Sequence, residues 1–178
     1  MSLLVSSLTT GLALTIFGFL FSRSNNIRSI ILGFPRSKRC SFWFVGISTL
    51  WFLGRHVAFL SEADFGNYKL LIGAIALGTG ILSFVFVADF LAVRGLAMMI
   101  LLWSREVLDA AFLNDALSRL ILVSVVYILI VLSIYFGAWP YKMRDFLEWL
   151  NQRSVRMSAF GWIFTLVGIL IISLSFSY

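Results

Sequence analysis

Long apolar runs separated by short charged segments are the dominant pattern along this chain of 178 residues. Four runs carry no charged residue: Leu3–Phe21, Leu70–Ala88, Leu120–Trp139 and Met157–Tyr178. A helix needs about 20 apolar residues to cross a hydrocarbon core of about 30 Å, because each residue adds about 1.5 Å. The pattern therefore predicts an all-α, polytopic membrane helix bundle.

Two further segments are apolar but contain charges. Ser41–Leu60 has the length of a span, with Arg55 and His56 in its last third. Phe90–Trp103 is short, and its extension to Phe112 adds charged residues that favour a helix whose far end emerges into water. The alternative is that this second segment is re-entrant and does not span.

The positive-inside rule decides between these two topologies. With six spans, ten of the 14 basic residues fall on one side: Arg23, Arg28, Arg36, Lys38, Arg39, Arg94, Lys142, Arg144, Arg153 and Arg156. The other four are Arg55, Lys69, Arg105 and Arg119. A re-entrant segment moves the loop around Lys142 to the opposite side and largely removes this bias.

We therefore predict one integral membrane domain over residues 1–178 with both termini outside. Its six spans are predicted at residues 3–21, 41–60, 70–88, 90–112, 120–139 and 157–176. The first run is not expected to be a cleaved signal peptide, because no basic residue precedes it. The pattern is typical of a protein of the bacterial inner membrane.

Two amphipathic segments fall in the basic loops. Apolar residues recur at helical spacing, as Ile27, Ile30, Ile31 and Phe34 and again as Met143, Phe146, Leu147 and Leu150. Both segments fit short interfacial helices on the cytoplasmic side. Residues expected at the lipid headgroups there are Arg36, Lys38, Arg39, Lys142 and Trp149. They predict either a surface for anionic lipids or simple anchors for the neighbouring spans.

Small residues form matching stripes in the first and last spans. The spacing is Gly-xxx-Thr-xx-Gly in both, at Gly11, Thr15 and Gly18 and at Gly161, Thr165 and Gly168. Small residues allow close packing where lipid supplies no hydrophobic drive between helices. The third span has a comparable pair in Ala74 and Gly78. The match is typical of ordinary helix packing, with a faint inverted repeat as the alternative.

Charged residues at the edges of the predicted spans are the candidates for a polar site. Arg55 can extend its guanidinium to the outer headgroups. His56 is the only histidine, so it could serve only as a lone cofactor ligand, and a hydrogen-bonded interfacial histidine is the favoured interpretation. We expect no metal site and no bound cofactor.

The second charged cluster comprises Arg105, Glu106 and Asp109. Arg105 and Asp109 have the i, i+4 spacing of an ion pair on one helix. Asp89 and Arg94 are five residues apart and could pair across a turn. The outer cluster is interpreted either as a polar or partner site or as the solvated face of a loop.

The net charge of +6 with 61% hydrophobic residues favours attraction to anionic lipid over nucleic acid. Phosphate-binding, zinc-protease and nucleophile-elbow motifs do not occur, so a membrane enzyme has least support. The best interpretation is an accessory or structural subunit, or an assembly partner, of a larger membrane complex. Its partners would be other membrane subunits or a second copy. The alternative is a small oligomeric transporter or channel.

Overall fold

The computed structural model describes residues 2–23, 31–61, 65–112, 114, 116 and 118–176. Helices form all the regular structure of these residues, and the all-α prediction is confirmed. The long helices are α1 (Leu3–Arg23), α3 (Lys38–Trp51), α4 (Lys69–Phe86), α5 (Leu91–Ala111), α6 (Arg119–Ala138) and α8 (Ser154–Ser175). A π-helix, η2 (Phe52–Val57), continues α3. Shorter elements are η1 (Phe34–Arg36), η4 (Gly66–Tyr68) and α7 (Pro140–Asn151).

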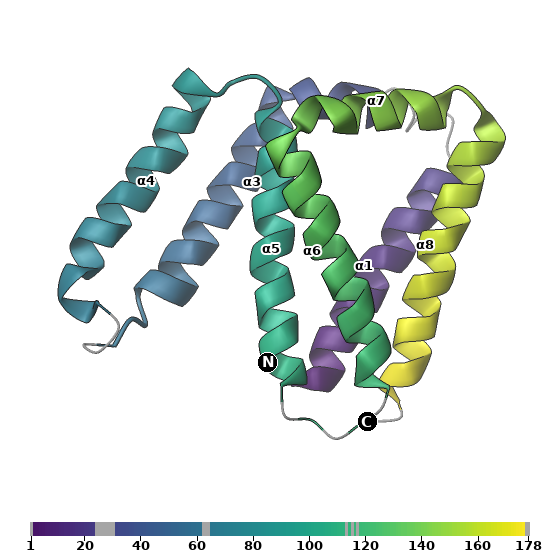
Figure 1. The fold of residues 1–178 in the computed structure, drawn as a ribbon, viewed down its shortest axis with the longest axis horizontal. Helices are drawn as coiled ribbons and strands as arrows, with labels where there is room; N and C mark the ends of the chain where they lie inside the picture. Colours follow the sequence, from purple (N-terminus) through teal and green to yellow (C-terminus); the bar gives the residue numbers. More distant parts are fainter. Residues whose placement is uncertain are drawn as a thin grey trace.

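The long helices run back and forth between two ends of the molecule (Figure 1). We call one the basic end: it carries α7 and the beginnings of α3, α5 and α8. The other, the terminal end, holds the beginning of α1 and the end of α8. As a result α3 and α5 run parallel to each other, whereas α1 and α8 are antiparallel.

Four helices are long and apolar enough to cross a membrane, and they match four of the six predicted spans. They cover Leu3–Ser22, Gly66–Phe86, Arg119–Ala138 and Ser154–Ser175. Helix α5 has 21 residues and is about as long as these four helices, but it includes charged side chains near both ends. In the α3–η2 segment the charges lie at both ends, at Lys38 and Arg39 in the first turn of α3 and at Arg55 in η2.

The main apolar core lies between α1, α5, α6 and α8. Its buried side chains are Leu3, Leu14, Val107, Ala111, Leu122, Val126 and Ile171. Trp103 of α5 packs against this core and donates a hydrogen bond from Nε1 to Thr10 Oγ1 at 3.2 Å. Burial of these groups holds the C-terminal half of α5 against the helix pair formed by α1 and α8.

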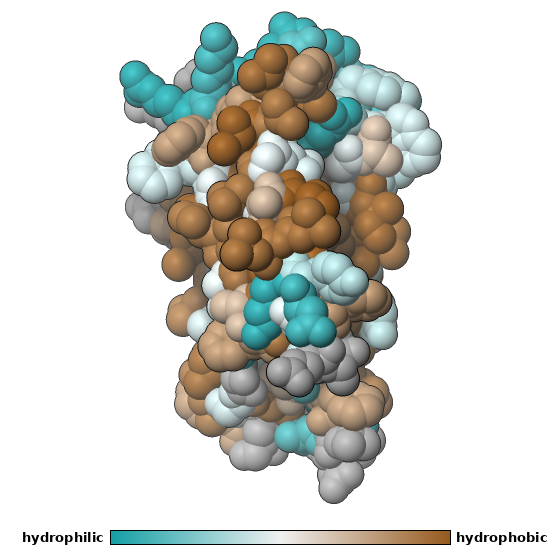
Figure 2. All heavy atoms as spheres, turned by 90° about the vertical axis from the view of Figure 1, so that its left-hand side faces the viewer, coloured by the Kyte–Doolittle hydropathy of each residue, from teal (hydrophilic) through white to brown (hydrophobic). Residues whose placement is uncertain are grey.

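Helix α4 has no buried residue and stands apart from the bundle (Figure 1). Its nearest neighbours are on the α3–η2 segment, where Gly80 faces Thr49 and Gly73 faces Leu53. Figure 2 views the molecule from this side and shows a hydrophobic band across the middle with hydrophilic groups above and below. Such a surface is typical of a helix that contacts lipid or another protein.

Helix α7 lies across the basic end, between α6 and α8 (Figure 1). Pro140 occupies its first turn, where a missing backbone N–H costs nothing. Its Leu147 and Leu150 are buried, and the Phe146 ring lies 6.0 Å from Phe136 and 5.5 Å from Phe160. The second amphipathic segment is therefore a helix packed on the bundle. In the first amphipathic segment, Ile27 and Ile30 lie outside the described residues, and residues 31–33 are helical.

Candidate functional site

A cavity of about 320 Å³ lies at the terminal end, between η2 and the last turns of α5. Its lining residues are Arg55, His56, Phe59, Arg105, Glu106, Asp109 and Ala110. Five of these are the charged or titratable residues that the sequence placed in two separate candidate groups. The structure brings both groups together because α3 and α5 run parallel, which puts their far ends side by side.

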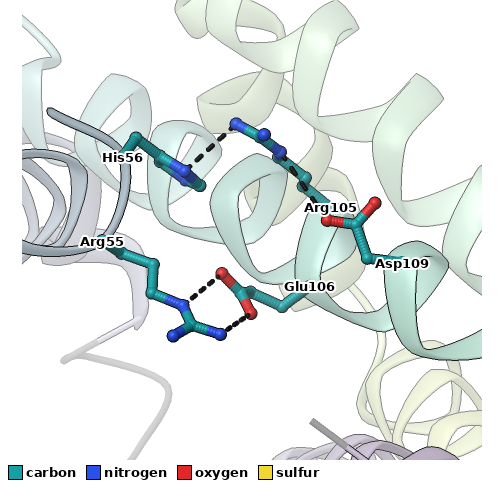
Figure 3. Close-up of polar contacts among 5 residues, drawn as sticks. All are labelled: Arg55, His56, Arg105, Glu106 and Asp109. Atoms are coloured by element: carbon teal, nitrogen blue, oxygen red, sulfur yellow. Dashed lines mark hydrogen bonds and ion pairs between the residues drawn. The ribbon is translucent and has the colours of Figure 1, made fainter. Parts of the chain in front are cut away.

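Arg55 and Glu106 form a contact of two hydrogen bonds in the cluster. The guanidinium donates from Nε to Oε1 at 3.1 Å and from Nη2 to Oε2 at 3.2 Å (Figure 3). The Glu106 side chain is only 11% exposed, whereas that of Arg55 is 54% exposed. This two-pronged geometry fixes the relative position of η2 and α5 more tightly than a single ion pair does.

His56 and Arg105 form a second contact across the same two helices. Arg105 Nη1 lies 3.1 Å from His56 Nδ1 (Figure 3). A guanidinium can only donate, so Nδ1 must accept and the imidazole is neutral with its proton on Nε2. Nε2 is buried and has no hydrogen-bond partner among the described residues. The lone pair that a metal or haem would require therefore faces Arg105.

Asp109 completes the cluster one turn beyond Arg105 on α5. Its carboxylate lies 3.8 Å from Arg105 Nε, which is long for an ion pair. Both side chains are well exposed, at 60% for Arg105 and 71% for Asp109. Because surface pairs of this kind contribute about 0 to 1 kcal/mol, these two side chains are only loosely tied to each other.

The local backbone explains how neighbouring residues Arg55 and His56 both reach α5. In the π-helix η2 each turn contains more residues than in an α-helix, so consecutive side chains are less widely separated around the axis. Ala58 N–H donates to Leu53 O at 2.9 Å, which is the five-residue spacing of this geometry. The residue pattern gives no sign of this change in winding.

Nearer the basic end, Gly95 lets α3 and α5 approach closely. A side-chain carbon at Gly95 would lie 2.9 Å from Phe44 Cβ and 3.0 Å from the Val45 backbone nitrogen. Ser48 also donates a hydrogen bond to Gly95 O at 3.4 Å. Sequence reasoning missed this position, because it followed repeated small residues and Gly95 is a single glycine.

The small-residue stripes of the first and last spans meet in the α1–α8 contact. A side-chain carbon at Gly18 would lie 2.5 Å from Gly161 O, and one at Gly11 would lie 2.9 Å from Gly168 O. The Thr15 hydroxyl donates to Gly11 O at 2.8 Å, and the Thr165 hydroxyl donates to Gly161 O at 3.0 Å.

Ala74 and Gly78, the small pair of the third predicted span, make no comparable helix contact in the described part of the chain. Gly78 has no atom within 4 Å of an added side-chain carbon, and Ala74 is exposed. Helix α4 faces α3 at Gly80 instead, where an added side-chain carbon would lie 3.0 Å from Thr49 Oγ1. Ala74 and Gly78 thus lie outside the helix contacts of the described residues.

Several other candidates lie at the basic end, away from the cavity. The Arg36 guanidinium lies 5.4 Å from the Phe90 ring, and Arg156 lies 4.6 Å from the Trp149 ring. Among the described residues, no ion pair joins Asp89 to Arg94.

The remaining basic residues of this end have varied surroundings. Lys142 Nζ lies 5.6 Å from the ring of Tyr141. Arg144 donates to Asp145, and this hydrogen bond raises the pKa of the guanidinium. Lys38 and Arg39 lie in the first turn of α3.

The cavity combines two guanidinium groups with two carboxylates around a neutral imidazole. Within the described part of the chain, His, Cys, Asp and Glu side chains form no group of three that could hold a metal ion. The paired charges suit recognition of a polar group, and no serine, cysteine, threonine or lysine side chain is among the described residues that line the cavity. No family model, curated protein or solved structure matches this chain.

Proposed function

We propose that this chain is a six-span membrane protein that serves as an accessory or structural subunit of a larger membrane complex, with α4 as its assembly surface. The observation that carries the proposal is that α4 has no buried residue, although it is 18 residues long and rich in glycine and alanine. A stable subunit needs each helix held by packing, and lipid alone supplies no drive for α4 to stay in place.

The glycines of the chain support the choice of α4. Gly11, Gly18, Gly161 and Gly168 lie where another helix backbone approaches closely. Gly78 of α4 has open space around it, and so has Gly46 of the neighbouring α3. Glycine in a helix costs about 1 kcal/mol relative to alanine, so an open glycine is best explained by a partner that needs close access.

Backbone strain also supports a partner for α4. The turns on either side of α4 contain Phe65 at φ 64° and Phe90 at φ 58°. This left-handed region is unfavourable for a side chain as large as phenylalanine. Both residues flank α4, which has no buried residue. We infer that the binding of a partner to α4 offsets the free-energy cost of these two backbone conformations.

The charge distribution supports the proposed orientation. The described basic residues of the basic end are Arg36, Lys38, Arg39, Arg94, Lys142, Arg144, Arg153 and Arg156. They outnumber Asp89, Asp145 and Glu148 on the same end. By the positive-inside rule the basic end faces the cytoplasm, so both termini lie outside and α7 lies in the cytoplasmic interface. We place the protein in a bacterial inner membrane, with anionic lipids at the basic end.

The assembly proposal is tested by mild extraction of the protein from its own membrane followed by native mass spectrometry. Gly78→Trp on α4 is compared with Val131→Trp, which introduces the same side chain at a 64% exposed position of α6. We expect partner subunits to co-purify with the wild type and with Val131→Trp and to be lost with Gly78→Trp. Isolation of the chain alone, or retention of all partners by Gly78→Trp, would contradict the proposal.

A second candidate function, a small oligomeric transporter, is favoured by one observation: the charged cavity at the terminal end. In this case Arg55→Ala or Asp109→Asn should alter solute flux in liposomes. Absence of flux under every imposed gradient would remove this candidate.

A further inference from the structure

The Arg105 guanidinium and the Asp109 carboxylate keep most of their hydrogen-bonding positions available in the terminal cavity. The Arg55 and Glu106 side chains satisfy each other through two hydrogen bonds. Arg105 uses one nitrogen for His56 and reaches Asp109 only at 3.8 Å. A guanidinium has five N–H donors and a carboxylate accepts about four hydrogen bonds, so both groups have unused positions. Figure 3 shows them side by side at the open edge of the cluster.

The balance of charges restricts what could bind there. The cavity lining has two guanidinium groups, two carboxylates and an imidazole that the Arg105 contact keeps neutral. A simple anion attracted by Arg105 would meet Asp109 and Glu106, and a simple cation would meet Arg55 and Arg105. A molecule with an anionic and an ammonium group on a short linker can satisfy Arg105 and Asp109 together.

We propose that this cavity binds a phosphate–ammonium zwitterion, with the phosphate on Arg105 and the ammonium on Asp109, and that its source is the headgroup of phosphatidylethanolamine. A free zwitterion such as phosphoethanolamine has the same charged groups. The lipid is the favoured source because an apolar ring borders the cavity: Phe59 lines it and is 76% exposed, so acyl chains could lie against it.

The choice of lipid rests on the six-span arrangement proposed above. In that arrangement Arg105 and Asp109 lie two to six residues from the end of α5 at Ala111. At about 1.5 Å per residue, this places them about 3 to 9 Å from the helix end, so that their side chains can extend to the lipid headgroups.

His56 helps to position the guanidinium of Arg105. Its Nδ1 accepts from Arg105 Nη1 at 3.1 Å, while Nε2 is buried on the other side of the ring. This contact uses one of the five N–H donors of Arg105 and leaves the others for the anionic half of the ligand.

The test is lipid retention by the full-length purified protein, measured by native mass spectrometry. The probes are phosphatidylethanolamine and phosphatidylglycerol with identical acyl chains, since the second lacks the amine. We expect the wild type to retain phosphatidylethanolamine about tenfold better, and Asp109→Asn to remove this preference, because it deletes the charged hydrogen bond to the ammonium group. Arg105→Gln should weaken retention of both lipids, since both carry the phosphate. Asp145→Asn, which makes the same change in an exposed arginine pair at the opposite end, is the control and should retain the preference.

Equal retention of both lipids by the wild type, or an unchanged preference in Asp109→Asn, would overturn the proposal. Asp109 is 71% exposed, and the Arg55–Glu106 contact stays in place, so this variant should fold even if Arg105→Gln does not. Soluble phosphoethanolamine should compete only in large excess. Competition at the concentration of the lipid would assign the site to a free zwitterion instead. Co-purification of partner subunits is a separate measurement, so the two proposals can fail independently.

Discussion

The guanidinium of Arg55 holds the carboxylate of Glu106 with two hydrogen bonds, although 51 residues separate them in the chain. Through this contact the end of η2 is attached to the last turns of α5. The two side chains are unequal in exposure, since Glu106 is largely covered and Arg55 is not. Their substitution should therefore have unequal effects on stability.

We expect Arg55→Ala to lower the Tm more than Glu106→Gln does. Removing Arg55 leaves a largely covered carboxylate without a partner, whereas removing the charge of Glu106 leaves a guanidinium that water can reach. Thermal unfolding in detergent of both single variants and of the double variant measures the two losses and their coupling. Equal losses would contradict the unequal burial of the two side chains, and additive losses in the double variant would show that the contact does not tie the helices.

Gly18→Ala should destabilise the α1–α8 pair by about 1 to 3 kcal/mol, the usual cost of overpacking. The added carbon would lie 2.5 Å from Gly161 O, which is backbone and cannot turn away. Gly78→Ala is the matched control, since nothing lies within 4 Å of that position. The control should be neutral or gain up to about 1 kcal/mol from helix propensity. Similar Tm values for the two variants would contradict the close approach of α1 and α8.

The α3–α5 contact allows the same comparison between two other glycines. Gly95→Ala would bring the new carbon within 3.0 Å of the Val45 backbone, whereas Gly46→Ala on α3 meets nothing within 4 Å. We expect a fall in Tm for the first variant alone. Because α5 also forms one wall of the cavity, Gly95→Ala should reduce zwitterion retention as well.

Ser104 is a buried residue of α5 whose hydroxyl has no hydrogen-bond partner among the described residues. Removing an unsatisfied buried hydroxyl relieves its desolvation cost and leaves only a very small cavity. Ser104→Ala is thus expected to hold or raise the Tm in a thermal melt. A clear drop would reveal a hydrogen bond that this hydroxyl makes in the membrane.

The proposed orientation predicts which ends of the helices are reached from outside the cell. After Cys40→Ser removes the native thiol, a membrane-impermeant maleimide should label Lys69→Cys at the terminal end. It should not label Lys142→Cys at the basic end until the membrane is opened. Labelling of Lys142→Cys in intact cells would place the basic end outside, which contradicts either the proposed orientation or the proposed number of spans.

The helical fold was largely predictable, because a span needs only a sufficiently long apolar run. The boundaries of α5 show this: the sequence predicted residues 90–112, and the helix covers Leu91–Ala111. The π-helix was not predictable, since winding depends on how η2 packs against α5 and leaves no periodic pattern. The same holds for α4, whose sequence resembles the other spans although it is the one that lacks buried residues.

The members of the candidate site were visible in the sequence, but their pairing was not. Arg105 and Asp109 could be paired from their spacing on one helix. The contacts of Arg55 with Glu106 and of His56 with Arg105 depend on the register of two parallel helices. At Gly95 the two helices leave no room for a side chain, and a single glycine carries no such information in sequence.

The contact between α1 and α8 has a consequence for the order of synthesis. The ribosome makes α1 before α8, with every other helix between them, so the glycine face of α1 enters the bilayer long before its partner exists. Correct assembly then depends on the late formation of a contact between the first and the last helix of the chain. A nascent chain arrested before residue 154 should leave α1 exposed to quality-control proteases, and supplying α8 as a separate peptide should protect it.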